Sequence, residues 1–196
     1  MSMLGIIIEK VSGMSYEAFL KQNLFEPNEI HGIAYHCADA NNENIADRFQ
    51  NGKDWGTIPQ HIVAVGNEPY WNLKANDGLE ASLNDTFLWA NAFTYHNILN
   101  DSTIQEMCTA QIVEEGYNGQ SFFGNGCNIS QSRRNTKMID NGGSNQIYFA
   151  RLFRLPQEGL VFYIVTNKNL HQCKHGFAKC NTVLFYRYYR TRYTYT

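Results

Sequence analysis

The residues with the clearest chemical potential in this chain are four side chains near its C-terminal end that can bind metal. Imidazole and thiolate groups are both zinc ligands, and here they form the pattern His-x-Cys-x-His-x4-Cys, with His171, Cys173, His175 and Cys180. Structural zinc sites usually take their ligands from two separate knuckles, and this spacing matches no common zinc module. We therefore expect no bound metal and no other cofactor, and we interpret the segment as a polar loop or the start of a helix.

Nucleophilic catalysis by a serine triad is a second chemistry that the residue types allow. The chain has 6 histidines, and its candidate nucleophiles are Ser121, Ser130, Ser132 and Ser144. No Gly-x-Ser-x-Gly elbow occurs, and no spacing pairs one of these serines with a particular histidine. We therefore predict no catalytic residue within this chain.

The segment from Lys174 to the C-terminus combines cations with tyrosine rings and contains no acidic residue. Cations beside stacking rings suit nucleic acid. A helix that closes over a sheet explains the same composition, because its rings are buried while its arginines extend to solvent. We favour a closing helix and a frayed tail over residues 170–196, with the frayed part from Arg190 onward, and we predict no nucleic-acid partner.

The size and charge of the chain limit its organisation. A chain of 196 residues can bury a sizeable core, so we expect a single domain over residues 1–196. Residues 1–100 carry 12 acids and 5 bases, a net charge of -7, whereas residues 101–196 carry 6 acids and 11 bases, a net charge of +5. This asymmetry indicates that the two halves face different neighbours, or each other.

Targeting signals are not recognisable in this sequence. Its first ten residues form no basic leader with a cleavage site, and no run approaches the roughly 18 apolar residues that span a bilayer. We therefore expect no secretory signal and no membrane partner. The 5 cysteines have no small-scaffold spacing, which favours free thiols. The compartment stays open, and a cytoplasmic location follows only if Met1 is the true start.

Helices dominate the predictions for the first half of the chain. Apolar residues at helical spacing predict an amphipathic helix over residues 4–11, ended by Gly13. Ser15 is expected to cap a second helix, which Pro27 ends. Asparagine, glycine and proline residues predict loops over residues 31–68, with one short strand near residues 62–65.

Two more helices are predicted further along. Ser82 and Asp85 form a capping box ahead of an apolar stripe, and this third helix should end near Leu99. A fourth short helix is expected over residues 101–111, capped by Asp101 or by the serine that follows it.

The strand signals lie in the second half of the chain. A strand near Phe122 runs into Gly124 and Gly126, which suggests a bulge or a close approach. From Ile139 to Asn167 the pattern is that of a glycine-rich start and a hairpin. Its first strand covers residues 146–155, its turn residues 156–159, and its second strand, expected to be buried on both faces, residues 160–165. Helices followed by strands predict an α+β fold with an antiparallel sheet.

Four segments in series resemble the C-terminal part of the serine β-lactamase and penicillin-binding-protein-like hydrolases, particularly the class C and esterase-like branch. They are LGIIIEKVSGMSYEAFLKQNLFEP from Leu4, IADRF from Ile45, GLEASLNDTFLWANAF from Gly78, and DNGGSN from Asp140 together with its hairpin. The first resembles the helix pair after the family's Tyr-x-Asn motif. The last resembles the family's third motif, Lys-Thr-Gly or His-x-Gly. The resemblance extends to about Asn169 and implies an incomplete β-lactamase-like fold.

The resemblance also implies what this chain lacks. In this family the serine of a Ser-x-x-Lys helix attacks an amide or ester, and the Tyr-x-Asn tyrosine assists proton transfer. No Ser-x-x-Lys sequence occurs here. The family's Tyr-x-Asn motif precedes the opening helix pair, so we expect it upstream of Met1. The implied protein is a truncated hydrolase, inactive alone; the alternative is a non-catalytic ligand- or protein-binding module that keeps the cleft wall.

The resemblance implies a substrate-binding edge at Asn141, Gly142, Gly143 and Ser144. In the family this strand contributes a backbone N–H to an oxyanion hole, and its Lys or His helps with charge and proton transfer. Asn141 stands in the place of that Lys or His and cannot titrate, whereas the N–H of Ser144 could still bind an oxygen. We expect a small amide or ester ligand, and an N-terminal half or a second copy of the chain that covers the sheet.

Overall fold

The computed structural model describes residues 2–35, 46, 48–50, 53–56, 74–95, 97–116, 119–144 and 148–167. The chain forms two compact units. The helical unit comprises residues 1–47 and 56–99, and the sheet unit comprises residues 48–55 and 100–196. Within the described ranges no helix is long and apolar enough to cross a membrane.

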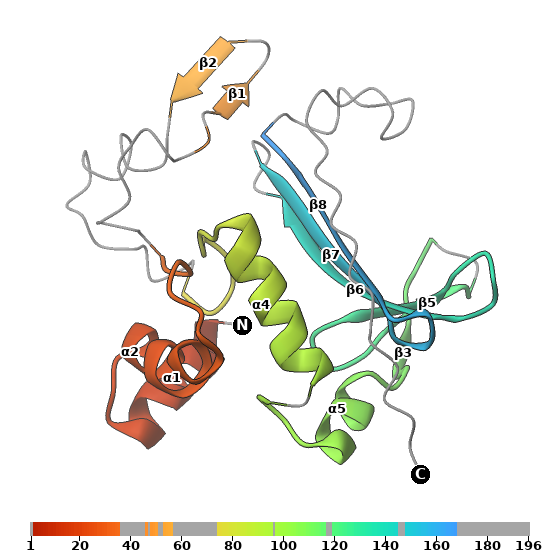
Figure 1. The fold of residues 1–196 in the computed structure, drawn as a ribbon, viewed down its shortest axis with the longest axis horizontal. Coiled ribbons are helices and arrows are strands. Elements are labelled where there is room, and N and C mark those ends of the chain that lie inside the picture. Colours follow the sequence, from red (N-terminus) through yellow and green to blue (C-terminus); the bar gives the residue numbers. More distant parts are fainter. Residues whose placement is uncertain are drawn as a thin grey trace. The chain divides into compact units, whose positions relative to one another are not determined.

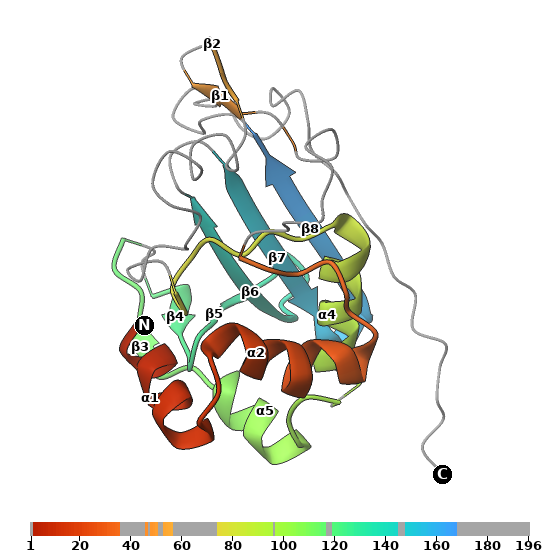
Figure 2. The ribbon, with the colours of Figure 1, turned by 90° about the vertical axis from the view of Figure 1, so that its left-hand side faces the viewer.

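The helical unit begins with the predicted pair of helices (Figure 2). Helix α1 spans Ser2–Ser12, and Gly13 ends it with a positive φ of 70° and an N–H donated to the carbonyl of Glu9. Helix α2 spans Tyr16–Leu20 and is capped by Ser15, whose hydroxyl accepts the N–H of Ala18. The cap of the second helix and the glycine stop are therefore where the sequence predicts them, and α1 begins two residues before the predicted range.

The chain after α2 keeps a helical course but changes its winding. A π-helical turn, η1, spans Lys21–Phe25, and a 3-10 turn, η2, spans Glu26–Asn28. Glu29 then ends the segment with a positive φ of 58°. Pro27 lies inside η2, where its missing N–H costs no helical hydrogen bond. The predicted stop at Pro27 is thus correct to within two residues.

Helix α4 spans Leu83–Thr94 and provides part of the core of this unit. The core combines side chains from α2, η1 and the following loop with two from α4: Leu20, Phe25, Ile30, Leu88 and Trp89. Trp89 contacts Phe25 and Phe93 edge to face, so it is a core anchor. The expected end near Leu99 is wrong, because Tyr95 already leaves the helical conformation.

One face of α1 contradicts the expectation of simple burial. Its apolar residues Met3, Leu4, Ile7 and Val11 are exposed, with exposed fractions of 71%, 53%, 53% and 83%. An amphipathic helix normally turns such a stripe toward a core. In this structure only Gly5 of α1 is buried, against the side chain of Ala75.

The sheet unit includes a short two-stranded sheet and helix α5. Strands β1 (Arg48–Gln50) and β2 (Lys53–Gly56) pair with each other, so the prediction of loops is wrong at this point. The strand predicted near residues 62–65 lies outside the described residues. Helix α5 spans Asp101–Met107, and its cap is Asn100, which accepts the N–H of Thr103. The predicted caps are thus one or two residues late.

Six antiparallel strands form the main sheet in the order β3-β4-β5-β6-β7-β8 (Figure 1). They are β3 Ile112–Val113, β4 Ser121–Phe123, β5 Asn128–Gln131, β6 Lys137–Ser144, β7 Phe149–Leu155 and β8 Leu160–Thr166. Every strand pairs with the next one along the chain. The described residues thus contain four α-helices and an antiparallel sheet, which confirms the predicted α+β class.

The hairpin of β7 and β8 is the best-predicted part of the sheet. Its connection is a 3-10 turn, Pro156–Glu158, followed by Gly159 with φ 61°. Strand β8 has no exposed residue, and its buried residues Val161 and Ile164 lie on opposite faces. Strands β3 and β5 and the first part of β6 are missing from the prediction, because short polar segments such as residues 128–131 carry little apolar alternation.

The core of the sheet unit lies between α5 and the first strands. It is formed by Cys108, Cys127, Ile129 and Ile139, with Ile104, Met107 and Phe122 packed against them. Gly124 permits this packing, because a Cβ there would lie 2.6 Å from the carbonyl oxygen of Met107. The predicted close approach at this glycine is confirmed.

Candidate active-site edge on strand β6

The predicted substrate-binding residues form the last part of β6. Strand β6 pairs with β7 as far as Ser144, whereas its pairing with β5 ends at Asp140, opposite Asn128. Among the described residues no strand pairs with Asn141, Gly142 or Gly143 on the β5 side, so this stretch forms an edge there, and Asn141 to Ser144 are all exposed. The glycine-rich segment is thus part of a strand rather than a loop that leads into one.

The side chain of Asn141 is already engaged within the protein. Its amide nitrogen donates a hydrogen bond of 2.5 Å to the backbone carbonyl of Gly126. That contact holds the side chain of Asn141 against the turn that precedes strand β5. Because the amide nitrogen is occupied, the side-chain oxygen is the atom of Asn141 that is suited to accept from a ligand.

The two glycines of this edge differ in their surroundings. A Cβ on Gly142 would lie 2.7 Å from Cγ of Arg151 and 2.9 Å from the carbonyl oxygen of Ala150. A Cβ on Gly143 would meet nothing within 4 Å. Gly142 is therefore required by packing against β7, whereas Gly143 leaves open space beside the strand.

The side chain that passes over Gly142 completes a buried ion pair. Arg151 reaches Asp140 with Nη2 at 2.6 Å and Nε at 2.8 Å from the same carboxylate oxygen. The side chain of Asp140 is only 3% exposed, and Asn128 contacts the same oxygen at 3.5 Å. Arg151 also lies over the ring of Phe153, 5.3 Å from its centroid. The residue just before the candidate edge is thus held by charge-assisted hydrogen bonds.

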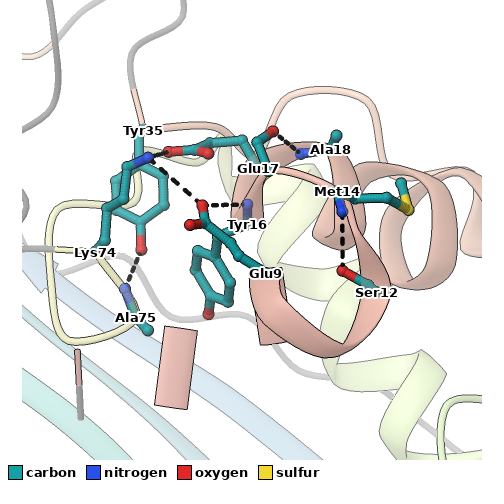
Figure 3. Close-up of polar contacts among 10 residues, drawn as sticks. Glu9, Ser12, Met14, Tyr16, Glu17, Ala18, Tyr35, Lys74 and Ala75 are labelled. Atoms are coloured by element: carbon teal, nitrogen blue, oxygen red, sulfur yellow. Dashed lines mark hydrogen bonds and ion pairs between the residues drawn. The ribbon is translucent and has the colours of Figure 1, made fainter. Parts of the chain in front are cut away.

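A second buried charge lies in the described part of the helical unit, at residues that belong to none of the family's catalytic motifs (Figure 3). The ammonium of Lys74 lies 2.8 Å from Glu17 and 3.9 Å from Glu9. The hydroxyl of Tyr35 accepts the N–H of Ala75 at 2.6 Å, and burial raises the pKa of Tyr35 to about 12. Tyr35 therefore stays protonated at neutral pH, which makes it unsuitable as a general base.

The other candidate serines occupy structural positions. Ser121 donates to Glu114 at 2.6 Å, Ser132 shares a hydrogen bond with Thr136, and the buried hydroxyl of Ser130 has no hydrogen-bond partner among the described residues. Cys108 and Cys127 are free thiols, as predicted. His171, Cys173, His175 and Cys180 lie outside the described residues, as does the predicted closing helix. Elsewhere in the described ranges no cluster of three or more His, Cys, Asp or Glu side chains could hold a metal.

The letters Tyr-x-Asn occur twice in the chain, at residues 70–72 and 95–97. Both follow the opening helix pair, whereas the family motif precedes it. Tyr95 lies at the C-terminal end of α4, where its N–H is donated to the carbonyl of Asn91, and residues 70–72 are outside the described ranges. Neither tripeptide takes the place that the resemblance assigns to the motif.

The chain matches the beta-lactamase family over residues 1–174, and it therefore belongs to this family of β-lactamase and penicillin-binding-protein-like hydrolases. No curated protein matches it. The predicted family is thus confirmed.

Solved structures share its fold. A penicillin-binding protein homologue from Pyrococcus abyssi, described as octameric, has a TM-score of 0.68 at 22% identity, covering 84% of this chain and 36% of its own. A penicillin-binding protein from Bacillus halodurans has a TM-score of 0.66 at 17% identity, covering 85% and 48%. A D-stereospecific amidohydrolase from Streptomyces sp. has a TM-score of 0.67 at 15% identity, covering 84% and 47%. The chain thus spans less than half the length of these proteins.

Sequence reasoning missed the residues that support the edge. Asp140 and Arg151 are an acid and a base in strands that pair. Their diagonal contact depends on the register of the two strands, which cannot be read from the sequence alone. The signal that was available is the small size of Gly142, opposite Arg151, since glycine in a strand interior often marks a close approach.

Proposed function

We propose that this chain is the C-terminal portion of a hydrolase that acts on an amide or ester through an acyl-serine, and that residues 141–144 form one wall of its site. The observation that carries the proposal is the end of β5–β6 pairing at Asp140. An exposed strand edge can receive the backbone or acyl group of a ligand by strand addition. One of the fold neighbours is a D-stereospecific amidohydrolase, which favours an amide as ligand class.

The chemistry of this wall is binding and orientation. A backbone N–H of this edge would stabilise the developing charge on the acyl oxygen. Gly143 leaves room for the ligand beside the strand, and Asn141 offers an acceptor oxygen held in place by Gly126. Asn141 cannot exchange a proton at neutral pH, so proton transfer must come from other groups.

The same chain is proposed to be inactive by itself. The family nucleophile and its lysine belong to a Ser-x-x-Lys sequence, which this chain does not contain. The exposed apolar face of α1 suits a partner, because such stripes are normally covered. We propose that an N-terminal half of the domain covers it; a second copy of this chain is the competing occupant.

A serine-directed acylating probe tests the inactivity. We expect that a fluorescent penicillin, incubated with the purified chain, leaves its mass unchanged, while an intact penicillin-binding protein is acylated in parallel. Stoichiometric labelling of this chain would disprove the proposal and locate an unexpected nucleophile.

Ligand binding at the edge is tested separately. Titration of the 15N-labelled chain with a D-amino-acid amide should shift the amide signals of residues 141–144 more than those of the rest of the sheet. Gly143→Leu fills the open space and should abolish these shifts. Val113→Leu, at an exposed position of β3, is the matched control and should leave them intact. Shifts that survive Gly143→Leu would place the ligand elsewhere.

Saturable binding without acylation has a further meaning. If the chain alone bound the amide tightly as a cooperative monomer, the non-catalytic binding module would replace the truncated hydrolase as the better description.

A further inference from the structure

Two cysteines of the sheet unit lie together in its core and have no role in the proposed hydrolase site. Cys108 ends helix α5, and Cys127 immediately precedes strand β5. Both are buried, with exposed fractions of 3% and 7%, in the same apolar cluster. Nineteen positions of chain separate them, so their proximity is a product of the fold.

The local backbone holds the two thiols against each other. The sulfur of Cys127 lies 3.5 Å from the carbonyl oxygen of Met107, the residue before Cys108. The N–H of Asn125 is donated to the same oxygen at 3.0 Å. The turn over residues 124–127 is closed by a 2.8 Å hydrogen bond from Gly124 N–H to the carbonyl of Cys127. The end of α5 and this turn are therefore one hydrogen-bonded assembly.

The charges around the pair distinguish its two sulfurs. The guanidinium of Arg154 reaches Cys108 with Nη2 at 3.9 Å from Sγ, whereas the thiol of Cys127 donates to the carbonyl oxygen of Met107. The adjacent Cys127 thiol, followed by the positive charges of Arg154 and Lys137, lowers the pKa of Cys108 in spite of its burial. The adjacent Cys108 and burial raise the pKa of Cys127. The cation beside Cys108 therefore favours Cys108 as the thiolate and leaves Cys127 as the proton donor.

We propose that Cys108 and Cys127 form a peroxide-reactive dithiol that closes to a disulfide. Hydrogen peroxide is the oxidant. The Cys108 thiolate attacks one oxygen, the O–O bond breaks, and the departing hydroxide takes the Cys127 proton to form water, which leaves a sulfenic acid on Cys108. The Cys127 thiolate then attacks that sulfur, the S–O bond breaks and hydroxide leaves. Two thiols have then been oxidised to one disulfide, and one peroxide has been reduced.

Access to the buried pair is consistent with the size of the oxidant. Helix α5 has only 7 residues, and the strands next to the turn, β4 and β5, have 3 and 4. Local opening of the end of α5 or of the turn before β5, short of global unfolding, would expose the two sulfurs. A small oxidant such as hydrogen peroxide needs only such an opening.

The disulfide would act on the edge of β6 through its neighbours. Gly126, beside Cys127, accepts the side-chain hydrogen bond of Asn141, and Asn128, on its other side, contacts Asp140. Linking Cys127 covalently to α5 therefore restrains the turn that holds both residues. The chemistry of the pair does not depend on the proposed hydrolase function, because no ligand of the edge takes part in it.

Peroxide treatment of the chain carrying Cys37→Ser, Cys173→Ser and Cys180→Ser tests the proposal with only this pair left. The expected product has lost two hydrogen atoms and yields a linked peptide of Cys108 and Cys127 on digestion without reductant. In the additional variant Cys127→Ser, a cyclic diketone should trap sulfenic acid on Cys108. In Cys108→Ser, Cys127 should stay unmodified. Stable sulfinic acid on Cys108 with Cys127 intact, or two unreacted thiols, would overturn the proposal.

Arg154 supplies a control that separates thiolate chemistry from simple exposure. Arg154→Met should slow alkylation of Cys108 by iodoacetamide at neutral pH by about tenfold, the effect of one pKa unit, while Arg154→Lys should stay near the wild-type rate. The pH at which the alkylation rate reaches half of its maximum should be higher in Arg154→Met than in the wild type. In urea all variants should react alike. Equal rates and profiles for the two folded variants would refute the assignment of Cys108 as the activated thiol.

Discussion

Among the described residues, the helical unit buries the charged side chains of Lys74 and Asp85 and the sheet unit buries that of Asp140, and the charges of Lys74 and Asp140 are compensated differently. In the helical unit the buried cation of Lys74 lies between two carboxylates, Glu9 and Glu17, whose side chains are 23% and 34% exposed. In the sheet unit the anion of Asp140 is 3% exposed and depends chiefly on the single guanidinium of Arg151. The counter-ions are partly hydrated in both units, since the side chain of Arg151 is 31% exposed, but Lys74 has two of them and the more deeply buried Asp140 has chiefly one.

This difference links the sheet site to function. The Lys74 cluster joins α1 and α2 to the segment before α4. The Asp140–Arg151 pair lies directly before Asn141 and occupies the space over Gly142. The comparison therefore predicts that polar substitutions in the sheet unit change both stability and the candidate site, whereas those in the helical unit change stability alone.

The largest expected effect comes from breaking the pair in the sheet unit. Arg151→Met should lower the free energy of unfolding by roughly 3–5 kcal/mol, because it leaves the buried Asp140 carboxylate without its counter-ion. Urea unfolding monitored by circular dichroism measures the loss. The double variant Arg151→Met with Asp140→Asn should recover part of it. A loss no larger than that of an exposed ion pair would mean that Asp140 is hydrated.

The two glycines of the edge should separate packing from binding. Gly142→Ala should cost about 1–3 kcal/mol, since its methyl group would overlap Arg151 and the carbonyl of Ala150. Gly143→Ala should change stability by no more than about 0.5 kcal/mol, because the space there is open. Thermal melts of the two variants make the test. Equal destabilisation would remove the distinction between a packing glycine and a site glycine.

A smaller effect is expected from the buried cation of the helical unit. Lys74→Met should cost about 1–2 kcal/mol, because the two carboxylates it leaves behind can be hydrated. Lys21→Met is the matched control, since its 3.9 Å contact with Glu26 is exposed and should contribute almost nothing. Chemical shifts of residues 141–144 should be unchanged in both variants. A loss as large as that of Arg151→Met would contradict the contrast between the units.

The smallest effect is a dependence of stability on pH through Asp85. Burial alone would raise the pKa of Asp85, but hydrogen bonds from the Ser82 hydroxyl and the N–H groups of Gly32 and His31 lower it overall. The stabilisation is therefore fully present above the pKa of the unfolded chain and is lost as pH falls through the folded pKa. Asp85→Asn should flatten this part of the pH dependence, measured by urea unfolding from neutral to acidic pH. An unchanged slope would show that other carboxyl groups cause it.

Local signals predicted the elements that depend on neighbours in sequence. Ser15, Gly13 and Ser82 each act within three or four residues, and each stands where it was expected. The capping box is only half correct, because the carboxylate of Asp85 turns to His31 and Gly32, more than fifty positions away, instead of back to the N–H of Ser82. Glycine at position 32 permits that approach, since a Cβ would collide with the carboxylate.

By itself the sequence determined the family, the α+β class, the helix caps and the hairpin of β7 and β8, because helix caps, turns and alternating strands are short-range patterns. Only the tertiary structure decided where β5 pairing stops, which glycine is held by packing and which side chain neutralises Asp140. It also brought Cys108 and Cys127 together. These features depend on strand register and on contacts between residues distant in the chain, and a one-residue shift of register would change every one of them.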